Sequence, residues 1–173
     1  MEQPTLHAPW RMEYIRSLGQ EDRSECFLCR AAAAGGDPAL RRDRLLVWDT
    51  ELSIVVMNRF PYANGHLLIA PRLHKGEMED LSDAEQLDLS RQTIAAIRLL
   101  KRAISAQGFN VGINIGRVAG AGLPGHLHQH LVPRWGGDIN FMSIVGETRV
   151  IPQAIEQLYD ELLRVRAEMP NAE

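Results

Sequence analysis

The sequence has few of the features that mark secreted, membrane-bound or nucleic-acid-binding proteins. Its first residues lack a basic segment followed by an apolar core, so no signal peptide is expected. No apolar run approaches the roughly 20 residues that a membrane span requires. The net charge of -3 gives no broadly basic surface for nucleic acid. These absences predict a cytoplasmic protein whose partners include neither a membrane nor a nucleic acid.

Cysteine is also scarce, and its two residues, Cys26 and Cys29, lie in a single Cys-x-x-Cys motif. In a reducing cytoplasm this spacing favours metal or redox chemistry over a structural disulfide. The motif is a common half-site for tetrahedral zinc.

What the sequence does contain is the pattern of a single α+β domain. Its 173 residues, 45% hydrophobic and 24% charged, suffice for one core. Alternating or β-branched segments predict strands at 45–49, 52–58, 66–70, 109–116 and 126–132, the last ended by Pro133. We therefore expect a largely antiparallel sheet, one long helix on the sheet and a C-terminal helix.

Capping and periodicity predict the two helices. Ser82 and Glu85 fit a capping box at the start of the long helix, which ends by Gly108. Its apolar residues at helical spacing predict the face that packs on the sheet: Leu87, Ile94, Ile97, Leu100 and Ile104. The C-terminal helix begins near Pro152 and carries a narrow apolar seam: Ile155, Leu158, Leu162, Val165 and Met169. This seam packs either on the domain or on a second subunit.

Three histidines recur at every second position of the last predicted strand. Because alternate side chains of a strand share a face, His126, His128 and His130 are expected to point the same way. Such a row fits either metal binding or nucleophilic catalysis by a central histidine held in one tautomer. Structural histidines are the less favoured alternative.

A glycine-rich loop precedes the histidines. It contains Gly116, Gly120, Gly122 and Gly125, and Asn114 lies just before it. Glycines allow unusual backbone angles and a close approach of ligand, and main-chain N–H groups in such a loop can hold an anion. Beside the histidines, the loop suggests a phosphate held next to a nucleophile.

The run Gly125–Pro133 (GHLHQHLVP) resembles the motif of the histidine-triad (HIT) family, His-φ-His-φ-His-φ-φ, where φ is apolar. Gln129 departs from φ, but its position faces away from the site, which suggests that its side chain is wet or paired. The likeness extends upstream to Asn58–Pro71 and covers about residues 26–145. The resemblance implies a HIT domain at 26–145, an N-terminal extension at 1–25 and a C-terminal helical segment at 146–173.

Within the family, the sequence is most similar to bacterial diadenosine tetraphosphate phosphorylases of the mycobacterial type. Three stretches carry this likeness: Ala8–Tyr14, Gly108–Gly116 and Val132–Phe141. Fhit-type dinucleoside polyphosphate hydrolases are the next most similar group. The resemblance implies an enzyme that cleaves small dinucleoside polyphosphates by phosphorolysis or hydrolysis, works without an organic cofactor, and forms a homodimer.

The resemblance also implies roles for individual residues. His128 would attack the α-phosphorus of the nucleotide, and water or phosphate would then resolve the nucleotidyl-histidine. His130 would contact the α-phosphate, and His66 would lie beside the triad. Asn58 would contact the ribose, and Asn114 the phosphate or the nucleophile.

Two further positions bear on the substrate. Gly122 lies four residues before His126, where related phosphorylases carry serine and Fhit-like enzymes glutamine. Only a main-chain donor remains there, which leaves the choice between phosphorylase and hydrolase open. Trp135 matches a tryptophan that shapes the phosphorylase substrate site, although packing under a loop is an equal alternative.

Cys26, Cys29, His74 and His126 form a candidate set of four zinc ligands. The stretch Pro71–Lys75 resembles the segment of zinc-bearing HIT proteins whose histidine joins two cysteines, and the first triad histidine is the fourth ligand there. Such a closed site would be structural and would leave His128 free. Two reduced thiols, or a redox pair, are the alternatives.

Two other functions compete with dinucleoside polyphosphate cleavage. A Hint-like phosphoramidase would act on adenosine monophosphate esters of amines, but the serine usually found near the triad is absent. A nucleotide-binding or sensing protein with weak turnover is the other alternative, and the intact set of His66, Asn114, His128 and His130 argues against it.

Overall fold

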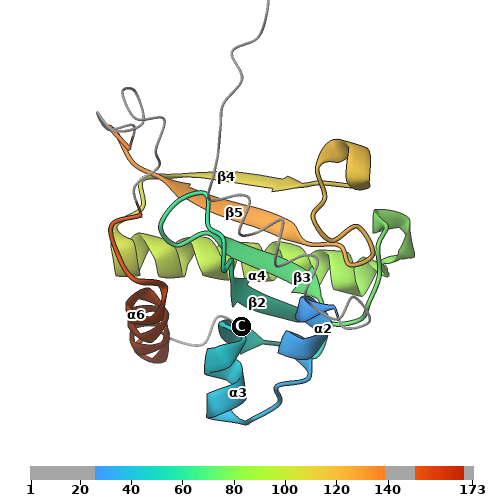
Figure 1. Ribbon diagram of the computed structural model, residues 1–173, viewed down its shortest axis with the longest axis horizontal. Coiled ribbons are helices and arrows are strands. Elements are labelled where there is room, and N and C mark those ends of the chain that lie inside the picture. The colour runs from blue at the N-terminus through green and yellow to red at the C-terminus, as the bar shows by residue number, and fades with distance from the viewer. Residues whose placement is uncertain (1–25, 139–150, 170–173) are drawn as a thin grey trace, which may run out of the picture.

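The computed structural model of the protein describes residues 26–138 and 151–169, which form a five-stranded antiparallel sheet with helices on both faces (Figure 1). The strands are β1 (Leu46–Asp49), β2 (Ser53–Met57), β3 (Leu67–Pro71), β4 (Gly108–Ile113) and β5 (Gln129–Arg134). The helices are α2 (Phe27–Ala32), α3 (Pro38–Asp43), α4 (Asp83–Ile104) and α6 (Ile155–Ala167), with short 3-10 turns η1 (Met78–Asp80) and η2 (Arg117–Ala119). This confirms the predicted α+β class. The predicted extension at 1–25 and parts of the 146–173 segment lie outside the described residues.

The strand order β1-β2-β3-β5-β4 leaves β1 and β4 at the edges. All five residues of β3 are buried, because its alternate side chains enter two separate cores. Leu67 and Ile69 join the larger core under α4 and α6, whereas Leu68 and Ala70 join the core under α2. No helix within 26–138 or 151–169 combines the length and apolarity that a membrane span needs.

Helix α4 has the predicted start but a different buried face. The Ser82 hydroxyl accepts from the Glu85 N–H and the Glu85 carboxylate accepts from the Ser82 N–H, which confirms the capping box. Leu87 and Ile94, however, are 52% and 50% exposed, so their predicted packing on the sheet is wrong. Leu100 is buried as predicted, but the rest of the buried face combines two further leucines with small residues that a search for large aliphatic spacing does not count: Leu89, Thr93, Ala95, Ala96 and Leu99.

Helix α6 packs on its own domain. It begins at Ile155, three residues after Pro152, and buries Leu158, Leu162 and Val165 in the larger core. The Tyr159 hydroxyl also donates to the main-chain oxygen of Leu46 on β1 (2.9 Å). The apolar seam was expected to pack either on the domain or on a second subunit. In the structure it packs on the domain of its own chain.

Strand β5 differs from its predicted bounds at both ends. It begins at Gln129 instead of His126, and it continues past Pro133 to Arg134. Pairing with β3 stops at the Leu67–Leu131 pair, whereas pairing with β4 continues to Arg134. Pro133 therefore lies where β5 has no neighbour on the β3 side, a place where a missing N–H is tolerated.

Candidate active site

The histidine-bearing segment is a paired strand only from Gln129 onward. Register pairs with both β3 and β4 reach Gln129, and residues 126–128 lie beyond them. The segment is held by the end of β3 and by the stretch that follows it: His126 Nε2 donates to the oxygen of Pro71, the last residue of β3 (2.8 Å), and Leu127 N–H donates to the Lys75 oxygen (2.6 Å). The expectation of three histidines on one regular strand face is therefore wrong. His128 and His130 lie together, and His126 contacts the cysteines.

His128 is 7% exposed and has a defined tautomer. Its Nδ1 lies 2.8 Å from the main-chain oxygen of His126. Because a carbonyl oxygen can only accept, Nδ1 carries a proton, and in the neutral ring Nε2 then carries the lone pair. A neutral imidazole in this form is a nucleophile near neutral pH.

His66 fixes the tautomer of His130 in a similar way. His66 Nδ1 accepts from the Tyr62 main-chain N–H and from the Asn58 amide, both at 3.2 Å. Its Nε2 therefore carries the proton and donates to His130 Nδ1 (3.0 Å). His130 is left with Nε2–H as a donor, and its ring centroid lies 5.0 Å from that of His128.

Burial keeps this histidine pair neutral. Desolvation, followed by the neighbouring His130 and His128, lowers the pKa of His66 to about 3. Desolvation and His128 lower the pKa of His130 to about 4. At neutral pH both rings are therefore uncharged, as the hydrogen bond between them requires.

Tyr62 belongs to the site although the sequence pattern does not reveal it. Its ring stacks on His66 with centroids 4.9 Å apart, and it lies 6.0 Å from the His130 ring. The spacing of four residues between Tyr62 and His66 is the only signal in the sequence, and it is not specific in an irregular loop.

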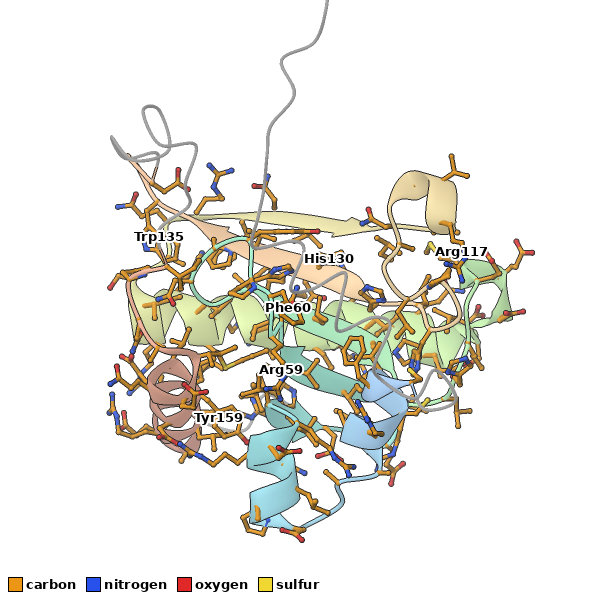
Figure 2. All side chains as sticks on the ribbon, viewed as in Figure 1. Arg59, Phe60, Arg117, His130, Trp135 and Tyr159 are labelled. Carbon is orange, nitrogen blue, oxygen red and sulfur yellow. The ribbon has the colours of Figure 1, made fainter. Side chains whose placement is uncertain are left out.

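Three other residues were expected to contact the nucleotide: Asn114, Gly122 and Trp135. Asn114 follows β4 directly, one residue after the Ile113–Gln129 pair, and Gly122 is exposed in the loop before His126. Trp135 follows β5 at the end away from His128, where its indole N–H donates to the Ile104 oxygen (3.1 Å) (Figure 2). The structure therefore brings together His66, His128 and His130 but not Trp135.

Gln129, the departure from the apolar pattern, is paired as expected. The hydroxyl of Thr93, on α4, donates to Gln129 Oε1 (3.2 Å). The side chain of Gln129 is thus directed toward the helix, away from the imidazoles of His128 and His130.

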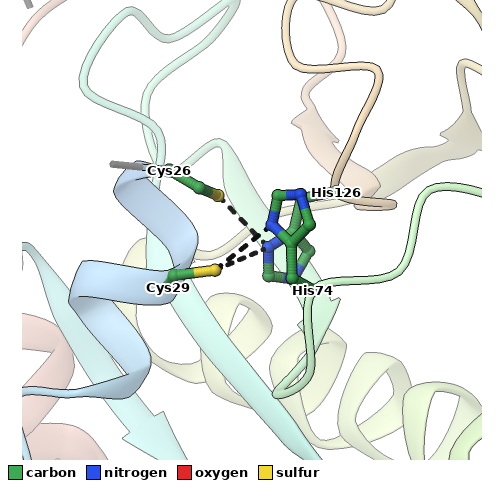
Figure 3. Close-up of side chains that lie close together, drawn as sticks. All are labelled: Cys26, Cys29, His74 and His126. Carbon is green, nitrogen blue, oxygen red and sulfur yellow. Dashed lines mark hydrogen bonds between the residues drawn. The ribbon is translucent and has the colours of Figure 1, made fainter. Parts of the chain in front are cut away.

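The four expected zinc ligands form one cluster (Figure 3). Their ligand atoms all lie within 4.8 Å of one another. His126 Nδ1 is 3.2 Å from Cys26 Sγ and 3.4 Å from Cys29 Sγ, and His74 Nδ1 is 3.3 Å from Cys29 Sγ. Ligands of a tetrahedral zinc are separated by about 3.5 Å. Two sulfurs and two imidazole nitrogens are also the donor set that zinc prefers, so these residues fit the metal.

The surroundings of the cluster support a cation. Burial and the neighbouring Cys26 raise the pKa of Cys29 to about 11, so the thiolate form needs a positive charge beside it. His126 Nε2 donates to the Pro71 oxygen, which directs Nδ1 toward the sulfurs. At Gly125, an added Cβ would approach His74 Nε2 to 3.2 Å. Glycine at position 125 therefore leaves space for the His74 side chain.

Comparisons with known proteins agree with this geometry. The family described as "HIT domain" matches residues 40–137. The AP-4-A phosphorylase of Mycobacterium tuberculosis is 40% identical over 151 residues, which cover 87% of this chain and 77% of that protein. The bis(5'-nucleosyl)-tetraphosphatase [asymmetrical] of Schizosaccharomyces pombe is 31% identical over 96 residues, 56% of this chain and 52% of that one. The structure of a Zn-bound histidine triad family protein from Mycobacterium smegmatis superposes with a TM-score of 0.65 at 22% identity, covering 84% of this chain and 95% of that one.

The lowered pKa of His66 makes stability pH-dependent. The unfolded chain binds a proton at His66 below about pH 6.5, whereas the folded chain does so only near pH 3. The free energy of unfolding should therefore fall as the pH drops through this window, with His66 contributing up to about 1.4 kcal/mol per pH unit. Urea unfolding of wild type and His66→Gln across the window measures the difference in slope. Equal slopes, or an NMR titration of His66 near its ordinary pKa, would contradict the assignment.

Proposed function

The chain belongs to the histidine-triad (HIT) family, and we propose that it cleaves dinucleoside polyphosphates through a nucleotidyl intermediate on His128. The observation that carries the proposal is the hydrogen bond from His128 Nδ1 to the His126 oxygen, which leaves Nε2 free to attack. The neighbouring donor on His130 adds support. The similarity to a phosphorylase and a tetraphosphatase that act on dinucleoside tetraphosphates favours this substrate class.

In the first step, the lone pair on His128 Nε2 attacks the α-phosphorus. A nitrogen–phosphorus bond forms, and the leaving nucleoside polyphosphate takes the electron pair of the broken phosphorus–oxygen bond. His130 Nε2–H donates to an α-phosphate oxygen as charge develops there. In the second step, water, which releases a proton to solvent, or inorganic phosphate attacks the same phosphorus, and His128 Nε2 leaves with the electrons of the nitrogen–phosphorus bond.

The nucleotide contacts are also proposals. We propose that Asn58 contacts the ribose, since it adjoins His66, and that Asn114 contacts the phosphate or the nucleophile. Gly122 offers a main-chain donor from the exposed loop. The role of Trp135 in shaping the substrate site stays a prediction.

Replacing the nucleophile tests the central step. His128→Ala should lower turnover of diadenosine tetraphosphate by more than about 10⁴-fold, because the covalent route is lost. Gln129→Val is the matched control, since Gln129 lies next to His128 but contacts α4, and it should retain most activity. The measurement is nucleotide release followed by chromatography.

The same assay identifies the acceptor. Formation of ADP and ATP only with inorganic phosphate marks a phosphorylase, and formation of AMP and ATP without it marks a hydrolase. Residual turnover in His128→Ala close to wild type would rule out the proposed intermediate.

We further propose that Cys26, Cys29, His74 and His126 bind a structural zinc ion, as the mutual distances of their ligand atoms and their chemistry suggest. When bound, the ion would neutralise the thiolates and join α2 to the segment that carries His128. Reduced thiols in this role fit a cytoplasmic protein.

Metal analysis tests the zinc proposal. Protein purified without chelator should contain about one equivalent of zinc, and Cys29→Ser should contain much less and unfold at a lower temperature. Ser24→Ala, two residues before Cys26, is a control that leaves the ligands intact. Free, reactive thiols in wild-type protein with only trace zinc would contradict the proposal.

A homodimer is the proposed assembly. Strand β4 is an edge of the sheet, and its Val111 side chain is 45% exposed. Two apolar side chains on α4 are also exposed, Leu87 at 52% and Ile94 at 50%. Sedimentation equilibrium should give twice the chain mass, and Val111→Lys should shift the protein toward monomer. A monomer at about 100 μM would contradict this assembly.

A further inference from the structure

We propose that the partly buried ion pair of Lys75 and Glu85 positions the segment 126–128 for the reaction at His128. The inference rests on the proposed function, since it assigns to the pair a role in that reaction. Neither residue touches the imidazoles of the site in the contacts described above, so both are positioning residues.

The segment 126–128 has two main-chain supports: His126 N–H donates to the Leu123 oxygen (3.4 Å), and Leu127 N–H donates to the stretch after β3. The register pairs of β5 stop at Gln129. Between the two histidines, Leu127 N–H donates to the Lys75 oxygen over 2.6 Å. The position of the Lys75 carbonyl group therefore sets the path of the chain from His126 to His128.

Lys75 is in turn held by Glu85. Its ammonium group donates to both carboxylate oxygens of Glu85, at 2.8 and 2.7 Å. The Glu85 side chain is 6% exposed and that of Lys75 is 24% exposed, so the pair is screened less than a surface ion pair. Lys75 also pulls the pKa of Glu85 down, more than any other group does, to about 2.

Glu85 lies in the first turn of α4 and is held there by the capping box. It is the third residue of α4, and its Oε2 also accepts from the Ser82 main-chain N–H and hydroxyl, each at 2.8 Å. Helix α4 has 22 residues and packs on β2 and β3. The ion pair thus connects the start of the longest helix to the main-chain support of the nucleophile.

The connection acts on chemistry through the His126 carbonyl group. That oxygen accepts the His128 Nδ1 proton and lies one residue before Leu127. If Lys75 moves, Leu127 and the His126 oxygen lose their fixed position, and the His128 ring loses its single orientation. A displacement of about 1 Å can lower turnover roughly 100-fold.

The test compares Lys75→Met with Lys75→Arg and with the double variant Lys75→Met/Glu85→Gln, which leaves no unpaired buried charge. We expect Lys75→Met and the double variant to lower kcat roughly 10- to 100-fold with KM nearly unchanged, and Lys75→Arg to restore most of it. Asp160→Asn, which breaks the exposed Arg42–Asp160 pair, is the control and should change neither constant.

A readout that does not require turnover accompanies the kinetics. ¹⁵N spectra of the His128 ring should show one Nδ1–H tautomer in wild type and Lys75→Arg, and a mixture of tautomers in Lys75→Met and the double variant. Bound zinc is measured in each sample. If Lys75→Met does not fold, the double variant decides.

Unchanged His128 spectra in a folded variant would overturn the proposal. Loss of zinc in parallel with the spectral change would also overturn it, because displacement of His74 would then explain the altered spectra. Altered spectra in Lys75→Met, together with a wild type that cleaves no dinucleoside polyphosphate, would support the positioning role and refute the proposed function. The two failures are therefore distinguishable.

Discussion

The hydrogen bond between His128 Nδ1 and the His126 carbonyl oxygen is the interaction on which the rest of the site depends. A main-chain oxygen offers no proton, so this contact allows only one neutral tautomer of His128. The Tyr62 N–H fixes His66 by the converse logic, since an N–H can only donate. His66 then fixes His130. Backbone groups thus determine which ring nitrogen carries the proton, and no carboxylate takes part in these contacts.

His126 serves both halves of the site. Its Nδ1 faces the two cysteines, its Nε2 donates to the Pro71 oxygen, and its main-chain oxygen holds His128. The cluster of cysteines and histidines and the His128 ring are therefore connected through one residue. Any group that orders the His126 side chain also orders the carbonyl group on which the His128 tautomer depends.

The sequence allowed the fold class, the α4 capping box and the four-ligand cluster to be predicted, because each rests on local chemistry or on a specific motif. The spacing of large aliphatic residues does not predict the buried face of α4, because Thr93, Ala95 and Ala96 form part of that face. The alternation of histidines indicated a strand, but pairing ends at Gln129, and pairing depends on the lengths of β3 and β4. The support from Lys75 and the stacking of Tyr62 arise from tertiary contacts that no spacing encodes.

Each end of helix α4 contacts a residue that lies near one end of β5. Near its start, Glu85 binds Lys75, and at its last residue the Ile104 oxygen accepts from the Trp135 indole. The whole helix has 22 residues and is about 33 Å long. Local opening at either end of β5 therefore strains the same helix, and the sheet and helix should exchange their amide hydrogens as one cooperative unit. The segment 126–128, although it lies outside the regular ladder, would share the protection of that unit.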